Sequence, residues 1–127
     1  AHPDHSSDGL VAHEIAHQWY GNLITTRNGA KIWLNEGFAT YLSRLYITKD
    51  RGVDEGDYVR LNEIRGFMRA DKAKRRPTVD FNYEEPFELF SSHVYAKGSL
   101  ILTMLQDVLG EDGFWRSIKN YILKNPI

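Results

Sequence analysis

The chain has 127 residues, of which 42% are hydrophobic and 26% charged. A chain of this length and composition can bury one hydrophobic core, so we expect a single domain. A formal net charge of −1 and a pI near 6.6 give no reason to expect nucleic acid or an anionic membrane surface as a partner. No apolar run approaches the roughly 18 residues of a membrane span, and the absence of cysteine excludes disulfides and thiolate metal sites.

The amino end is a polar lead-in to the first predicted helix. Ser6, Ser7 and Asp8 are candidate N-caps, and the helix is expected over about residues 8–20, ending near Gly21. His2 and His5, although they could be metal ligands, are expected to be solvent-exposed residues of a frayed terminus. The chain begins with neither an initiator methionine nor a signal peptide, so we expect it to be a piece of a longer protein.

Two histidines and an acid in this helix form a candidate metal motif. His13 and His17 stand one turn apart on one face, with Cβ atoms about 5–6 Å from each other, so both imidazoles can reach one ion. Glu14 lies about 100° around the helix, where it is better placed to hydrogen-bond a water on the metal, as a general base, than to bind the metal. The alternative is a solvated helix face, which the apolar neighbours disfavour: Leu10, Val11, Ile15, Ala16 and Trp19.

A catalytic zinc site needs a third protein ligand as well as a water, and a second helix can supply it. Residues 22–30 are expected to form an extended connector with a turn, followed by a helix over about 31–49. Glu36 is the candidate ligand, because the 18 residues that separate it from His17 allow the chain to turn and return. The alternative is an ordinary exposed acid in the first helical turn. The apolar face around Glu36 comprises Ile32, Leu34, Phe38, Tyr41, Leu42, Leu45 and Tyr46.

Three more helices complete an all-α prediction of about five helices. A surface helix is expected over about 54–72, with a loop over 73–86 and a short turn over 87–90. The basic residues at the end of this helix are expected to be solvated: Lys72, Lys74, Arg75 and Arg76. A central buried helix is expected over about 92–109, since it is apolar nearly all round, and a last helix over about 111–124.

Tyr95 lies in the first turn of the expected helix over 92–109. Periodicity alone favours a core ring with a satisfied hydroxyl over a catalytic donor. His93, two residues earlier, is expected to be a surface or loop histidine.

Three motifs give the chain a family resemblance. They are HEIAHQWYGN at residues 13–22, WLNEGFA at residues 33–39 and YAKG at residues 95–98. In order and spacing they resemble the aminopeptidase N family of gluzincin zinc metallopeptidases, which includes leukotriene hydrolase. The resemblance spans roughly residues 10–125. It implies one zinc ion bound by His13, His17 and Glu36, Glu14 as general base, and Tyr95 as the hydroxyl that stabilises the tetrahedral oxyanion.

The same resemblance sets the expected fold and function. Residues 1–127 would be a helical fragment similar to the helical half of a thermolysin-like catalytic domain, whose parent removes amino-terminal residues from peptides. Family members carry a Gly-Ala-Met-Glu-Asn element upstream that grips the substrate's free amino group, and a β-rich lobe that forms the other cleft wall. Without these parts we expect little peptidase activity and self-association through exposed apolar surface. The alternatives are an epoxide hydrolase of the leukotriene-hydrolase type and a non-catalytic binding module that kept the fold.

One position departs from the thermolysin-like pattern. Enzymes of that type can use an Asp four residues after the ligating Glu as a partner of a metal-bound histidine. Here that position is Thr40, so the sequence does not assign the oxygen partners of the histidines.

Overall fold

A computed structural model describes residues 5–20, 32–75, 77–78 and 93–124. Within these ranges the chain is helical and has no strand, so the all-α prediction is confirmed for them. The predicted connector over 22–30, the turn over 87–90, most of the 73–86 loop, and His2 lie outside the described residues. No described helix is both long enough and apolar enough to cross a membrane. The elements are η1 (His5–Ser7), α1 (Asp8–Ala16), α2 (Trp33–Arg51), α3 (Val53–Ala73), η4 (His93–Lys97) and α4 (Gly98–Lys124).

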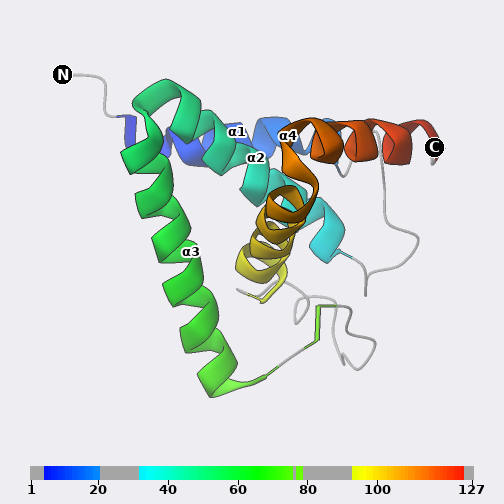
Figure 1. The fold of residues 1–127 in the computed structure, drawn as a ribbon. Helices are drawn as coiled ribbons and strands as arrows, with labels where there is room; N and C mark the ends of the chain where they lie inside the picture. Colours follow the sequence, from blue (N-terminus) through cyan, green and yellow to red (C-terminus); the bar gives the residue numbers. More distant parts are fainter. Residues whose placement is uncertain (1–4, 21–31, 76, 79–92, 125–127) are drawn as a thin grey trace.

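Helix α2 is the central element, because it packs against α1, α3, η4 and α4 (Figure 1). Its first half supplies the core: Phe38 stacks on Tyr20 with ring centroids 4.0 Å apart, and Tyr41 lies against Phe114 at 5.5 Å. Leu102 and Ile118 of α4 complete the buried cluster. Two helices of the candidate site, α1 and α2, are therefore held by one shared core.

Helix α1 ends at Ala16, four residues earlier than the sequence predicts. The amide groups of Gln18 and Trp19 donate to the carbonyls three residues before them, at 3.0 and 3.1 Å, instead of four. This tighter turn ends the regular helix and leaves the His17 side chain on the final turn.

The start of α1 follows the sequence prediction only in part. Ser7 occupies the N-cap position but its side chain makes no capping hydrogen bond. Asp8 instead pairs with Arg51 at 2.9 Å and with His5 at 3.1 Å. The His5 side chain is 66% exposed, which confirms the expectation of a solvent-exposed residue.

Helix α3 runs along one side of the molecule and projects away from α1 and α4 (Figure 1). Leu61, Ile64 and Met68 are exposed, as expected of a surface helix. Lys72, Lys74 and Arg75 are exposed too, whereas Arg76 lies outside the described residues.

The two helices expected over 92–109 and 111–124 are the two arms of α4, which is kinked between them (Figure 1). A π-helical turn, η4, leads into α4, and the interruption falls at Gly110, whose backbone (φ 72°, ψ 168°) is not helical. The prediction that the first of these helices is buried all round is wrong. Leu102 is buried, but Met104 and Val108 are 65% and 81% exposed. The described neighbours cover only one face of this helix, so apolar residues on its other face are exposed in spite of their composition.

Candidate metal centre

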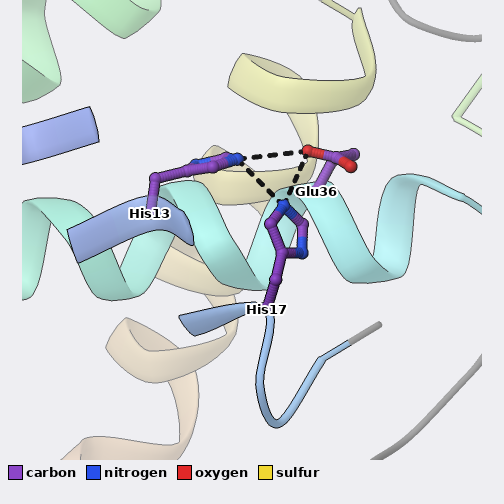
Figure 2. Close-up of side chains that lie close together, drawn as sticks. All are labelled: His13, His17 and Glu36. Carbon is purple, nitrogen blue, oxygen red and sulfur yellow. Dashed lines mark hydrogen bonds and ion pairs between the residues drawn. The ribbon is translucent and has the colours of Figure 1, made fainter. Parts of the chain in front are cut away.

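The side chains of His13, His17 and Glu36 converge on one point between α1 and α2 (Figure 2). The two histidine Nε2 atoms are 3.1 Å apart. The Glu36 Oε2 atom lies 3.2 Å from Nε2 of His13 and 3.4 Å from Nε2 of His17. In the part of the chain that the structure describes, this is the one group of three or more histidine and acidic side chains close enough to hold a metal ion.

The triangle formed by these two nitrogen atoms and the Glu36 oxygen has the size expected for three ligands of one tetrahedrally coordinated ion. Nitrogen and oxygen ligands at about 2.0–2.1 Å from zinc in tetrahedral directions lie about 3.3 Å from each other. The three atom pairs here, at 3.1, 3.2 and 3.4 Å, match that spacing. The alternative interpretation of Glu36 as an exposed acid does not hold, because its side chain is only 9% exposed. A carboxylate buried to this degree needs charged or hydrogen-bonding partners, and a cation supplies one.

The second ring nitrogen of His17 has a fixed partner. Its Nδ1 lies 2.8 Å from the backbone carbonyl oxygen of Tyr20. A carbonyl only accepts, so Nδ1 carries the proton and donates it, and in a neutral imidazole Nε2 then has its lone pair free for a metal. The sequence could not assign this partner, because it is a backbone group presented by the tight turn after α1.

Thr40 lies at the edge of the same pocket, four residues after Glu36. Its hydroxyl is buried, and no described residue makes a hydrogen bond with it. The oxygen partner of the His17 ring is therefore the Tyr20 carbonyl and not the side chain at position 40.

Glu14 and Tyr95 line the same pocket as the three metal-centre residues. The pocket has a volume of about 1040 Å³ and lies between α1, α2, α3 and η4. Glu14 is exposed, and among the described residues none pairs with its carboxylate, which leaves it available to a molecule in the pocket. The structure thus brings all five residues singled out in the sequence to one place.

Tyr95 is presented by η4 rather than by a regular helical turn. Its ring centroid is 5.9 Å from that of His13. Burial, reinforced by the carboxylates of Glu36 and Glu14, raises the pKa of the Tyr95 phenol above its usual value. A phenol is protonated at neutral pH even at its usual pKa, so the Tyr95 hydroxyl can donate a hydrogen bond. The His93 side chain lies outside what the structure describes, so its expected place on the surface or in a loop stays a prediction.

A buried ion pair that the sequence did not predict lies at the far end of the pocket. Arg44 of α2 donates to Glu63 of α3 at 2.7 Å, and Ser99 of α4 donates to the same carboxylate oxygen at 3.0 Å. Arg44 also donates to the Thr103 hydroxyl. Burial raises the pKa of Glu63, which Arg44 partly opposes, and burial lowers the pKa of Arg44. The network ties together α2, α3 and α4, of which α2 and α3 line the pocket.

Comparison with known proteins identifies the family. Residues 3–126 match the Peptidase family M1 domain. The chain belongs to peptidase family M1. This confirms the predicted resemblance to the aminopeptidase N family, and membership implies zinc as the metal.

Several curated proteins similar to this chain are named as aminopeptidases. The chain is 35% identical over 119 residues to leucyl aminopeptidase of Saccharolobus solfataricus and 38% identical over 122 residues to aminopeptidase Ey of Gallus gallus. It is 36% identical over 118 residues to human endoplasmic reticulum aminopeptidase 2. These alignments cover 89–91% of the chain but only 12–15% of each relative, so the chain spans a small part of their length.

Two solved structures share the fold. Yeast LTA4 hydrolase in complex with bestatin matches with a TM-score of 0.86 and 30% identity, covering 97% of this chain and 21% of that one. An M1 zinc metallopeptidase mutant from Deinococcus radiodurans, bound to a Tyr-Ser-Ala substrate, matches with a TM-score of 0.77 and 25% identity. That alignment covers 95% of this chain and 26% of the bacterial one.

Proposed function

We propose that this M1 chain forms the zinc-binding catalytic segment of an aminopeptidase, with residues 1–127 as one helical unit of the catalytic domain. The convergence of His13, His17 and Glu36 on one point, at tetrahedral spacing, carries this proposal. These three residues would hold one zinc ion. A zinc ion bound there would polarise the scissile carbonyl and lower the pKa of a water in the site.

Two further residues would act on the substrate directly. Glu14, exposed in the pocket, accepts the proton of the attacking water and returns it to the leaving amine. Tyr95, whose phenol is protonated at neutral pH, donates a hydrogen bond to the oxyanion that develops on the carbonyl oxygen. A neutral phenol stabilises this charge without adding a charge to the ground state. The substrate would be a peptide with a free amino terminus.

Substitution of Glu14 tests the proposal. In the full-length protein, Glu14→Gln should keep its zinc but lower kcat for an aminoacyl substrate by about 10²–10⁴ or more, the range of general base catalysis. Glu55→Gln, which makes the same change on the exposed first turn of α3, is the matched control and should leave kcat unchanged. Retained turnover in Glu14→Gln would refute the role of the base.

A second candidate function is epoxide hydrolysis at the same site, favoured by the likeness to yeast LTA4 hydrolase. Assays of the full-length protein on a peptide and on an epoxide substrate separate the two activities. Turnover of neither substrate by a zinc-loaded wild-type protein would instead support the third alternative, a non-catalytic binding module.

The 127 residues by themselves should have little peptidase activity. The family resemblance implies an upstream lobe with an amino-group clamp, and positioning of this kind can account for several kcal/mol of a barrier. Exposed apolar residues of α1 and its end favour self-association of the isolated chain: Leu10, Val11, Ile15 and Trp19. Sedimentation velocity at high concentration should show oligomers, and a clean monomer would contradict this expectation.

A further inference from the structure

The backbones of α2 and α4 touch at two glycines. A Cβ added to Gly98 would lie 2.9 Å from the Cα of Gly37 and 3.1 Å from the carbonyl oxygen of Trp33. A Cβ added to Gly37 would lie 2.9 Å from both the Cα and the carbonyl carbon of Gly98. All four of these atoms belong to the backbone, so they cannot rotate away as a flexible side chain can. The two helices can therefore approach this closely only if both positions are glycine.

This contact joins the two segments that carry the candidate metal centre and the candidate oxyanion donor. Gly37 directly follows Glu36 near the start of α2, and Gly98 lies three residues after Tyr95, where η4 passes into α4. Ala96, between Tyr95 and Gly98, is only 8% exposed and lines the same pocket. Any change in the α2–α4 separation at the glycines is thus transmitted to Tyr95 over one helical turn.

A hydrogen bond holds the same turn from its other side. The hydroxyl of Ser99, which is fully buried, donates to Glu63 at 3.0 Å, and Glu63 is fixed by its ion pair with Arg44. The start of α4 is consequently fixed against both α2 and α3.

We propose that the Gly37–Gly98 backbone contact, supported by the Ser99–Glu63 hydrogen bond, is a positioning device that sets the distance between Tyr95 and the metal centre. The inference rests on the proposed function, because it requires Tyr95 to act on the substrate. The two glycines and Ser99 are positioning residues, since they act only through Tyr95.

The expected effect follows from the size of a methyl group. Carbon atoms pack at about 3.5–4.0 Å, so a Cβ at 2.9 Å from backbone must push the helices apart by roughly 0.6–1 Å. A misplacement of about 1 Å can cost about 10²-fold in rate. The proposed metal ligands come from α1, the residue that follows it and α2, and α1 packs directly on α2, so zinc binding should survive.

The test is Gly98→Ala in the full-length protein. We expect kcat to fall by about 10- to 100-fold with little change in KM, while elemental analysis still finds about one zinc per chain. Gly113→Ala is the matched control in the same helix, because its added Cβ meets only the Leu109 side chain, at 3.4 Å. An unchanged kcat in folded, zinc-loaded Gly98→Ala would overturn the inference.

A double-mutant cycle with Tyr95→Phe separates positioning from a general loss of stability. Once the phenol is absent, Gly98→Ala should cost almost nothing further in kcat, whereas additive losses would overturn the inference. If Gly98→Ala does not fold, Ser99→Ala replaces it in the same cycle. A several-fold loss of kcat in Ser99→Ala that disappears in the Tyr95→Phe background supports the inference. If Tyr95→Phe itself retains full kcat, the proposed role of Tyr95 fails and this inference fails with it. A loss in Tyr95→Phe without one in the glycine and serine variants contradicts the positioning inference alone.

Discussion

The Nδ1 atom of His17 donates a hydrogen bond to the backbone carbonyl of Tyr20 at 2.8 Å. This bond depends on the early end of α1, because a regular helix through Tyr20 would direct that carbonyl along the helix axis. It fixes both the orientation and the tautomer of the imidazole. Since the acceptor is backbone, substitution of the Tyr20 side chain should leave the metal centre intact.

The Tyr20 side chain should make stability depend on alkaline pH. Burial, with a smaller contribution from Tyr121, raises the pKa of Tyr20 from 10.0 to about 12. A pKa raised by folding contributes stability that is fully present below pH 10 and is lost as the pH rises through about 12. The free energy of unfolding, measured by urea denaturation, should therefore fall across this window.

Tyr20→Phe is the control for this pH dependence. The variant should lose less stability than the wild type between pH 9 and pH 12. At pH 8 it should be at least as stable, since no described residue makes a hydrogen bond with the buried Tyr20 hydroxyl. An equally steep alkaline loss in the variant would show that other groups cause it.

Tyr95→Phe should lower kcat while leaving zinc content and thermal stability nearly unchanged. The phenol is proposed to donate to the transition-state oxyanion, and removal of one such donor costs about 10²–10³ in kcat. Steady-state kinetics of the full-length protein provide the measurement. Tyr58→Phe, on an exposed part of α3, is the matched control. A variant that lost zinc would indicate a structural role for Tyr95 instead.

The Arg44–Glu63 ion pair should matter for stability. Its side chains are only 8% and 10% exposed, so Arg44→Met leaves a buried carboxylate without its counter-charge. Loss of one partner of such a pair costs about 3–5 kcal/mol in the free energy of unfolding. The Arg75 side chain, which pairs with Asp71, is 87% exposed, so Arg75→Met should cost less than about 1 kcal/mol. Urea denaturation measures the free energy of unfolding of both variants, and equal losses in the two would contradict a special contribution of the buried pair.

The parts of the site that are local in sequence could be predicted well. The one-turn spacing of His13 and His17 fixes their shared face, and an acid in the first turn of the next helix can meet them wherever α1 and α2 pack antiparallel. The helix periodicity likewise predicts α2 and α3 to within a few residues. The sequence also predicts the interruption between the last two helices, because a glycine such as Gly110 readily takes the positive φ that breaks a helix.

What could not be predicted depends on contacts between distant segments or on backbone groups. The Tyr20 carbonyl has no sequence signal, and the Arg44–Glu63–Ser99 network joins three helices whose packing the sequence does not specify. The apolar residues of α4 indicate a buried helix by composition, yet burial depends on which neighbours are present, and Val108 is 81% exposed. The closeness of Gly37 and Gly98 is visible only once the helices are packed.

The zinc content of the purified full-length protein shows whether His13, His17 and Glu36 bind a metal ion together. It is measured by elemental analysis before chelation, after chelation and after zinc is returned, with His17→Ala as the control. We predict about one equivalent of zinc in the wild type, lost on chelation and recovered afterwards, and none in the variant. A folded wild-type protein that binds no zinc, or a His17→Ala variant that keeps a full equivalent, would contradict it.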